Sequence, residues 1–380
     1  MPAMLSVRKG TSQLRNAEQA ARELYDAIYQ PDIKLAVFYC APDYVLPQLA
    51  AALRVLFKEI NLVGCTSAGE ITPLGYLAGS LTGFSLAANE LDVSTRLIKL
   101  DAFDSAATAA SVTAQIDNLR ARSGVAATAA DTFAFLLIDG LSMQEELVVS
   151  CIYQQLQGIE LIGGSAADDV RFGATHLYHG GHFHQNVALL NLVRSGLPFL
   201  TFRTQHFIKS DKRMVVTGAD PAHRVVTEIN GRPAGLEYAR LLGLQVDQLT
   251  PLIFATHPVV VRVGGQYFVR SIAKVNDDAS LLFFCAIDEG IVLTLAKGVD
   301  MVANLQESFA RVRESLGKPL LVLGCDCILR RLETERSGTK QQIGQIFADN
   351  NVIGFATYGE QFNSMHVNQT FTGIAIGQPA

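Results

Sequence analysis

A repeated pattern of small and acidic residues constrains the fold of this chain more than any other feature of its sequence. Residues 62–86 read LVGCTSAGEITPLGYLAGSLTGFSL, and residues 352–376 read VIGFATYGEQFNSMHVNQTFTGIAI. The shared residues all keep one offset of 290 positions without a gap: Gly64 and Gly354, Gly69 and Gly359, Glu70 and Glu360, and Thr82-Gly83 and Thr372-Gly373. Because one register is kept over two strand-like runs and the turn between them, we infer a duplicated unit.

The segment around the first copy predicts a β-α-β-turn-β order. Hydrophobic runs predict strands at Leu35–Cys40, Leu62–Cys65 and Ser80–Ala87, and apolar residues at helical spacing predict a helix over 44–59. A further helix is expected over 11–30, with Thr11 or Ser12 as its cap.

The same order returns in the middle of the chain. The expected elements there are a strand at Thr132–Ile138, a helix at Gln144–Gln157, and strands at Leu161–Ser165 and Val187–Val193. The alanine-rich stretch Ala102–Ala130 predicts a helix that connects the two blocks, because its apolar residues keep one helical face.

Beyond Arg194 the pattern changes to alternating strands. Further strands are expected at Phe199–Ile208, Arg213–Gly218, Val225–Ile229, Val259–Val263, Tyr267–Ala273, Leu281–Ile287, Gly290–Thr294 and Leu320–Cys325, and helices at Ala234–Leu242, Val299–Leu316 and Gln341–Asp349. We therefore expect an α/β protein of two modules, 1–229 and 230–380. These modules contain repeated β-α-β-turn-β units with mixed, largely antiparallel sheets.

Length and composition narrow the class of protein. The chain has 380 residues, and its 49% apolar content is ample for large buried cores. A net charge of −5 gives no basic surface of the kind that binds nucleic acid. The start of the chain lacks the apolar core of a signal peptide, and the longest apolar runs are too short to span a bilayer. We expect a cytoplasmic protein that spans no membrane and whose six cysteines are reduced.

The three turn sequences VGCTSAGEI, IGGSAADD and GFATYGEQFNSMHVNQTFTGIAIG resemble those of the FIST family. The resemblance extends from about residue 30 to residue 377 and implies a FIST N-terminal sensory domain followed by a FIST C-terminal domain, in a signal-transduction setting. The segments GCDCILRRLE and MHVNQTFTG are most similar to the nitric-oxide-sensing FIST proteins of bacteria. That similarity implies a bound haem and a partner histidine kinase, and no enzymatic activity.

Small residues at the ends of the predicted strands are the first candidate ligand site. Ligands of open α/β sheets bind at such strand ends, where small side chains let them approach backbone N–H groups. The candidate turn residues are Gly64, Thr66, Ser67, Gly69, Gly163, Gly164, Ser165, Tyr358 and Gly359. The alternative is that these glycines only allow tight turns. A small organic ligand such as an amino acid, held at these turns, is the first alternative to haem.

Glu70 and Glu360 occupy equivalent positions of the duplicated unit. Paired carboxylates suit general acid–base catalysis, so a hydrolase or transferase using either residue is a second alternative. A structural explanation is that each glutamate braces its own turn.

His366 is the candidate axial ligand for haem iron, with His257 as the next candidate. We expect His366 to lie in a loop, with Phe362 and Met365 as an apolar wall and with Arg330 and Arg331 available for the propionates. A hydrogen-bonded structural histidine is the alternative.

Two other clusters carry metal-binding potential. His176, His179, His182 and His184 fall within ten residues, and the alternative for them is an exposed hairpin. Cys325 and Cys327 are expected on one side of a strand, where they would hold a soft metal or, with Cys65 and Cys285, an iron–sulfur cluster, or else simply pack in the core. The ligand, the partner kinase and a homo-oligomeric state stay open at this point.

Overall fold

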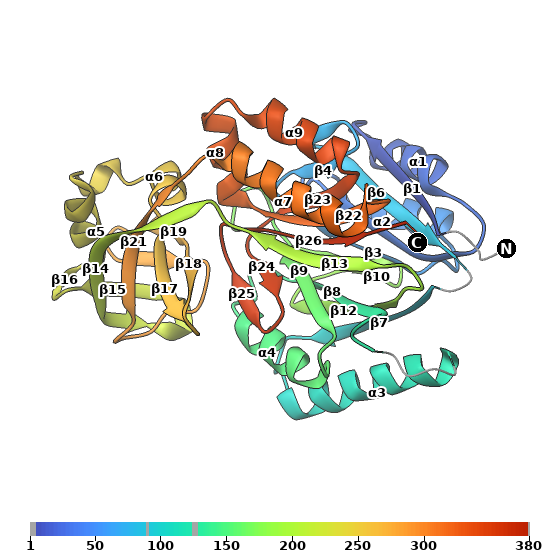
Figure 1. The fold of residues 1–380 in the computed structure, drawn as a ribbon, viewed down its shortest axis with the longest axis horizontal. Helices are drawn as coiled ribbons and strands as arrows, with labels where there is room; N and C mark the ends of the chain where they lie inside the picture. The colour runs from blue at the N-terminus through green and yellow to red at the C-terminus, as the bar shows by residue number, and fades with distance from the viewer. Residues whose placement is uncertain (1–4, 89–90, 124–127, 379–380) are drawn as a thin grey trace.

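The computed structural model describes residues 5–88, 91–123 and 128–378 as three similar units and one inserted lobe. In Figure 1 the helices of the three units lie on the outside of the main body, with α1 at the right, α3 and α4 at the bottom and α7, α8 and α9 at the top. The lobe projects at the left. The predicted α/β class with mixed sheets is confirmed.

The first unit, residues 6–87, follows the order β-α-β-α-β-β-β-β. Its elements are β1 (Ser6–Ser12), α1 (Ala17–Ile28), β2 (Ile33–Cys40), α2 (Leu46–Leu56), β3 (Leu62–Thr66), β4 (Glu70–Thr72), β5 (Gly75–Leu77) and β6 (Leu81–Ala87). Helix α1 begins where the Asn16 side chain accepts a hydrogen bond from the Gln19 N–H, a typical N-cap.

The second unit, residues 92–194, has the same order. Its elements are β7 (Asp92–Lys99), α3 (Ser105–Ser123), β8 (Thr132–Ile138), α4 (Glu145–Gln155), β9 (Glu160–Ser165), β10 (Leu177–His179), β11 (His182–His184) and β12 (Val187–Arg194).

The third unit has this order with one extra helix and with the lobe inserted after its first strand. Its elements are β13 (Phe199–Thr204), α7 (Met301–Leu316), β22 (Leu321–Cys327), α8 (Ile328–Arg336), α9 (Lys340–Asp349), β23 (Val352–Thr357), β24 (Glu360–Phe362), β25 (Met365–Val367) and β26 (Phe371–Ile376).

The lobe, residues 207–298, is a mainly antiparallel sheet in the order β18-β17-β21-β14-β15-β20-β19, with β16 pairing β15. Its elements are β14 (Phe207–Asp220), η1 (Pro221–His223), β15 (Val225–Ile229), β16 (Arg232–Pro233), α5 (Ala234–Leu242), η2 (Val246–Gln248), α6 (Pro251–Thr256), β17 (Val259–Val263), β18 (Gln266–Arg270), β19 (Ile272–Val275), β20 (Leu281–Phe283) and β21 (Val292–Gly298). It has its own apolar core around Tyr238 and Phe254.

The sheets of the three units share one internal order. It is β1-β6-β2-β3 in the first unit, β7-β12-β8-β9 in the second and β13-β26-β22-β23 in the third. In each order the last two strands are parallel, namely β2 and β3, β8 and β9, and β22 and β23, and the other neighbouring pairs are antiparallel.

Each unit also lends its hairpin to the sheet of another unit. Hairpin β4–β5 pairs with β23 of the third unit, β24–β25 pairs with β9 of the second, and β10–β11 pairs with β3 of the first. The exchange is therefore cyclic, and it locks the three units into one body.

Backbone hydrogen bonds between the turns follow the same cyclic order. The three bonds run from Ala68 N–H to the Ala356 carbonyl (3.0 Å), from Tyr358 N–H to the Ser165 carbonyl (3.3 Å), and from Ala167 N–H to the Thr66 carbonyl (3.0 Å). Donors and acceptors occupy equivalent positions of the three units. Those of the second unit follow those of the first by 99 residues, the offset between Gly64 and Gly163, and those of the third unit follow them by 290. The repeat is thus threefold in space.

The inner faces of the three sheets form one central core, and the helices cover the outer faces. Along β2, Val37 and Tyr39 belong to the central core while Ala36 and Phe38 face α1 and α2. Strands β8 and β22 alternate in the same way between the central core and their own helices. Because both faces are buried, the inner strands are continuous hydrophobic runs.

Several sequence predictions need correction. The helix expected over 11–30 begins only at Ala17, because Ser6–Ser12 pairs with β6 as strand β1. The connecting helix expected over 102–130 is α3 at Ser105–Ser123, and part of its predicted range, 124–127, lies outside the described residues. The domain boundary near Ile229 stays a prediction; in the structure this position lies in the lobe, between the paired strands β15 and β16.

No helix within the described ranges is both long and apolar enough to cross a membrane.

Candidate functional site

The repeated glutamates are braces of their turns. Glu70 accepts hydrogen bonds from the Ser67 hydroxyl (2.5 Å) and from the Ser80 N–H (3.0 Å) and hydroxyl (2.7 Å). Glu360 makes the same three bonds, with Thr357 and Thr370 at 2.7, 3.1 and 2.7 Å. Burial raises the pKa of Glu70 to about 7 and that of Glu360 to about 8, against the lowering effect of these hydrogen bonds.

Three glycines at equivalent positions are needed for close packing of the parallel strands. A Cβ on Gly64, Gly163 or Gly354 would lie 2.6, 2.3 or 1.9 Å from a backbone carbonyl of the neighbouring strand. Real Cβ atoms do not approach oxygen so closely, so these glycines have a structural explanation. The same holds for Gly164, where a Cβ would lie 2.6 Å from the Phe355 ring.

The polar groups of the candidate turns are engaged within the protein. The Ser67 N–H donates to the Cys40 carbonyl, and the Gly69 N–H donates to the Ser67 hydroxyl. The Thr66 hydroxyl accepts from the His176 N–H, and the Ser165 hydroxyl accepts from the Gln361 amide. These turns build the threefold ring.

His366 lies in strand β25, not in a loop, and is only 2% exposed. It is directly opposite Gln361 of β24, whose Nε2 lies 3.3 Å from His366 Nδ1. The other ring nitrogen, Nε2, is buried and has no hydrogen-bond partner among the described residues. A Cβ on Gly359 would lie 2.5 Å from this Nε2 and 3.0 Å from Asn368 Nδ2, so both nitrogens face the same turn.

His366 is neutral at physiological pH. Burial above all, together with the nearby Arg224 and Arg270, lowers its pKa to about 4 against the opposing effect of Glu146. A neutral imidazole either donates or accepts at Nε2, depending on its tautomer.

The surroundings of His366 join the body to the lobe and contain further buried polar atoms without partners. Asn368 accepts a hydrogen bond from the Ser271 N–H (3.4 Å) of the lobe. Across the residues that the structure places, Asn368 Nδ2, Ser271 Oγ and Arg270 Nε and Nη1 have no partner. We call Arg270, Ser271, Gln361, His366 and Asn368 the junction cluster. Most of its unpartnered atoms are donors.

A buried ion pair fixes the lobe beside this cluster. Arg224 of the lobe donates through Nη2 to Glu145 (2.6 Å) and Glu146 (2.5 Å) of α4, and through Nη1 to the Phe284 carbonyl. Arg270, in contrast, forms no ion pair with any residue that is described. The Arg270 guanidinium is therefore available for direct pairing with an anion.

Three aromatic rings from distant parts of the chain pack against one another where the lobe meets the body. Tyr358 stacks on Phe172 at 5.0 Å between ring centroids, and Phe284 of the lobe lies 5.9 Å from Tyr358 and 5.7 Å from Phe172. The Tyr358 hydroxyl donates to Asp168, which also accepts from the Gly173 and Ala174 N–H groups.

The arginines expected to hold haem propionates are already paired. Arg330 is fully buried, with Nε 2.5 Å from Asp326 and Nη1 2.9 Å from His206. Arg331 pairs with Asp169 (2.9 Å) and Glu335 (3.0 Å).

The other residues expected around the haem, His257, Phe362 and Met365, each have a separate structural contact. His257 caps the end of α6, with Nδ1 3.0 Å from the Thr256 hydroxyl. Phe362 packs on the central core and lies under Arg203, and Met365 is half-buried at the start of β25.

The four candidate cysteines lie in three different apolar cores of the described structure. Cys325 and Cys65 face the central core, Cys327 faces the helices of the third unit because the strand turns there into α8, and Cys285 belongs to the lobe core. The expectation that Cys325 and Cys327 share one side is wrong. Within the described ranges, no group of three or more His, Cys, Asp or Glu side chains is arranged to hold a metal ion.

Three of the four clustered histidines, His179, His182 and His184, lie in the hairpin β10–β11, and His176 directly precedes it; of the four, only His182 is exposed. His179 is opposite His182 across Gly180 and Gly181, which both have positive φ. His184 Nε2 lies 3.1 Å from the His179 carbonyl.

Arg270, Ser271, Asn368 and the Arg224 ion pair were not found from the sequence. They come from segments about a hundred residues apart, and neither a motif nor a periodicity connects them.

Together, the cyclic exchange of hairpins and the inserted lobe define an α/β protein of three repeated units. The FIST N domain matches residues 34–232 and the FIST C domain matches residues 234–363, and the chain belongs to the FIST family. FIST domains are sensor domains of signal-transduction proteins. No curated protein matches the chain.

Two solved structures are similar over most of the chain. Cyanuric acid hydrolase from A. caulinodans has 8% identity and a TM-score of 0.41, with 99% of each chain covered. T. maritima PurL complexed with FGAR has 10% identity and a TM-score of 0.21, covering 99% of this chain and 73% of that one. Both TM-scores are too low to carry an argument.

Proposed function

We propose that this protein is a sensor that binds a small organic carboxylate, such as an amino acid, at the junction cluster between the lobe and the third unit. The observation that carries the proposal is the set of buried donors without partners, at Arg270 and Asn368 above all. Each buried donor left unsatisfied costs about 1–3 kcal/mol. A carboxylate has two oxygens that accept hydrogen bonds and a charge opposite to that of Arg270.

The position of the cluster supports a sensing role. A ligand held by Arg270 of the lobe and Asn368 of the body adds a bond between the two parts. The lobe is joined to the body at both ends of one insertion and through the Arg224 ion pair. Binding then changes how firmly the lobe is held, which is a change that a signalling partner can detect.

The finer prediction of haem, nitric oxide and a partner histidine kinase depends on His366. A neutral, buried imidazole with a free Nε2 favours it. However, the Gly359 backbone lies so close to Nε2 that even a methyl group on residue 359 would collide with the ring. The packing around His366 therefore does not fit a porphyrin, and a small ligand is the better match.

An enzymatic function using Glu70 or Glu360 is less favoured. Each carboxylate is fully buried, and its hydrogen bonds go to its own turn. A catalytic carboxylate must reach a substrate.

The test is a thermal-shift titration of the full chain with amino acids and small dicarboxylates. We expect at least one to raise the melting temperature in a concentration-dependent way, and Arg270→Gln to remove that rise. Arg262→Gln is the matched control, because Arg262 is exposed on the adjacent strand β17. Equal shifts in the parent and in Arg270→Gln would disprove the site.

The same protein preparation tests the haem alternative. Haem added to the chain should give an intense band at the violet edge of the visible spectrum if it binds specifically. If that band forms and is lost only in His366→Ala, haem replaces the carboxylate as the ligand.

A further inference from the structure

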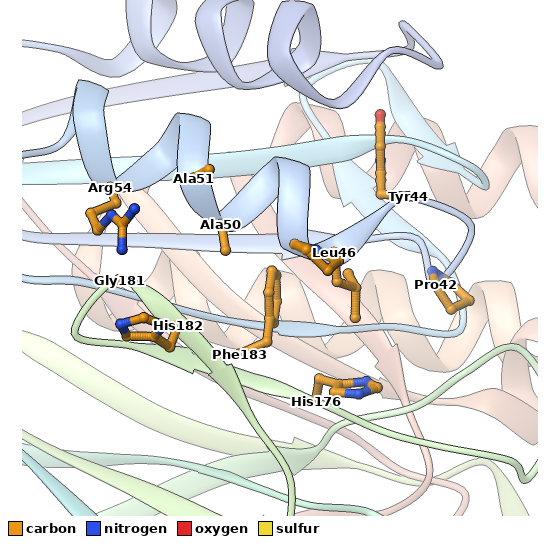
Figure 2. Close-up of a pocket in the computed structure, with 11 residues that line it drawn as sticks. Pro42, Tyr44, Leu46, Ala50, Ala51, Arg54, His176, Gly181, His182 and Phe183 are labelled. Carbon is orange, nitrogen blue, oxygen red and sulfur yellow. The ribbon is translucent and has the colours of Figure 1, made fainter.

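A pocket that shares no residue with the junction cluster lies between α2 of the first unit and hairpin β10–β11 of the second. It has a volume of about 660 Å³. This volume is within the range of sites that bind drug-sized molecules. Figure 2 shows helix α2 on one side and the hairpin residues Gly181, His182 and Phe183 on the other.

The middle of the pocket is apolar and rigid. Leu46, Pro47 and Ala50 line it from α2, and Phe183 faces them from the hairpin. The Phe183 ring is fixed by edge contacts with Tyr178 (5.2 Å) and Phe38 (6.2 Å) in the layer beneath. A flat ligand would therefore meet a preformed aromatic wall.

One end of the pocket is cationic. Arg54 and His182 lie at the same end in Figure 2, and His176 lies toward the other. No ion pair holds Arg54 among the residues that are described, and none of the described lining residues is acidic. This contrasts with the net charge of −5 of the whole chain.

Gly181 gives Arg54 its position. A Cβ on Gly181 would lie 2.8 Å from Arg54 Cδ, so only a glycine lets the arginine stem lie across the hairpin. Arg54 and Gly181 also line a neighbouring pocket of about 500 Å³ that contains His179 and the ion pair of Lys58 with Glu59 (3.8 Å). Arg54 thus lies between two cavities.

A second groove on the opposite side of α2 provides a comparison. It lies between α1 and α2, has a volume of about 820 Å³, and is lined by Glu18, Glu23 and Asp26 beside Arg22. Volume alone therefore does not set the Arg54 pocket apart. The difference is the aromatic wall and the absence of acidic side chains.

We propose that the pocket at Arg54 is a second ligand site, which binds a flat apolar molecule bearing one anionic group. The ring system lies between Phe183 and the apolar face of α2, and the anion pairs with Arg54. The proposal is independent of the junction cluster, because the two sites share no residue.

Anilinonaphthalenesulfonate has this chemistry and is the probe, since its fluorescence increases on binding. We expect one site per chain. Arg54→Gln, which keeps the stem but removes the charge, should weaken binding about tenfold. Phe183→Leu should weaken it about threefold. Added salt should weaken binding to the parent more than binding to Arg54→Gln.

Two matched variants control for dye bound elsewhere. Arg22→Gln removes the corresponding charge from the groove between α1 and α2, and Arg262→Gln removes an exposed charge from β17 of the lobe. Both should bind the probe as the parent does. The proposal is overturned if Arg54→Gln keeps the parent affinity, or if either control weakens binding as much as Arg54→Gln does.

Discussion

Hairpins β4–β5 and β24–β25 have the same backbone pairing and the same glutamate brace, but the side chains that face each other across the two strands differ in polarity. The directly opposed pair is Ile71 and Tyr76 in the first unit. In the third unit, at the same offset of 290, it is Gln361 and His366. The Tyr76 ring packs against Phe347 and only its hydroxyl is buried without a partner, whereas Gln361 and His366 are both polar and each has one buried atom without a partner in the described part of the chain.

This difference separates structure from function. Features that both hairpins share, the brace and the close-packed glycines, are needed by the fold itself. The polar pair occurs in one hairpin only, next to the lobe, where an apolar pair would be the more stable choice. A costly feature found in one of two equivalent positions points to a binding role.

The largest expected effect comes from removing a brace. Glu70→Ala and Glu360→Ala should each lower the free energy of unfolding by about 3–5 kcal/mol, because one N–H and two hydroxyl groups lose their acceptor in a buried site. Equilibrium urea denaturation measures this. Glu335→Ala, which removes a partly exposed partner of Arg331, is the control and should cost less than about 1 kcal/mol. Unequal losses in the two hairpins would break the comparison.

The braces also predict how stability depends on pH. Their pKa values in the fold, about 7 and 8, lie above the ordinary value of 4.5. The folded state therefore holds these protons more tightly, and stability is full below about pH 4.5 and falls as pH rises through 7 and 8. The loss approaches about 3 kcal/mol for Glu70 and about 5 kcal/mol for Glu360.

Melting curves between about pH 5 and pH 8 measure this loss. The matched control is the double variant Glu70→Gln with Glu360→Gln, which cannot titrate at these positions and should lose most of the slope. An unchanged slope would mean that the carboxylates are ionised in the fold at both pH values.

The sequence predicted the repeat, because glycines and glutamates in tight turns keep their spacing when a unit is duplicated. It also predicted most inner strands, whose burial on both faces leaves a continuous apolar run. It missed the exchanged hairpins, because β4, β5, β24 and β25 have only three residues each and pair with distant units. It placed His366 in a loop for the same reason.

The junction cluster was predictable only in part. His366 was singled out by its type and position. Arg270 and Asn368 were not, because their role arises from the insertion of the lobe into the third unit. Contacts between segments so distant leave no local pattern in one sequence.

A smaller loss of stability is expected from substituting the equivalent glycines Gly83 and Gly373 in β6 and β26, the last strands of the first and third units. A Cβ on Gly83 would lie 2.4 Å from the Val37 carbonyl, and one on Gly373 would lie 2.9 Å from the Phe202 ring. Replacing either with Val should cost about 1–3 kcal/mol through overpacking. Gly83→Val should cost more, since backbone yields less than a side chain. Melting curves in which neither variant differs from the parent would contradict the close approach.

The smallest effect on stability is expected from transplanting the apolar pair into the third unit, as Gln361→Ile with His366→Tyr. The exchange removes the unpartnered Gln361 Oε1 and His366 Nε2 and introduces one tyrosine hydroxyl, which is on balance favourable by about 1–3 kcal/mol. The larger ring beside Gly359 is unfavourable by a similar amount. Urea denaturation should therefore show a net change within about 1 kcal/mol.

This exchange should abolish ligand binding at the junction cluster. Without His366 and Gln361, the junction cluster loses two of its polar side chains. The carboxylate that stabilises the parent should then no longer raise the melting temperature. The mirror exchange, Ile71→Gln with Tyr76→His, is the control, and it should keep the ligand response although it weakens the packing on Phe347. A transplanted variant that still responds to the ligand as the parent does would show that the difference between the two hairpins has no part in binding.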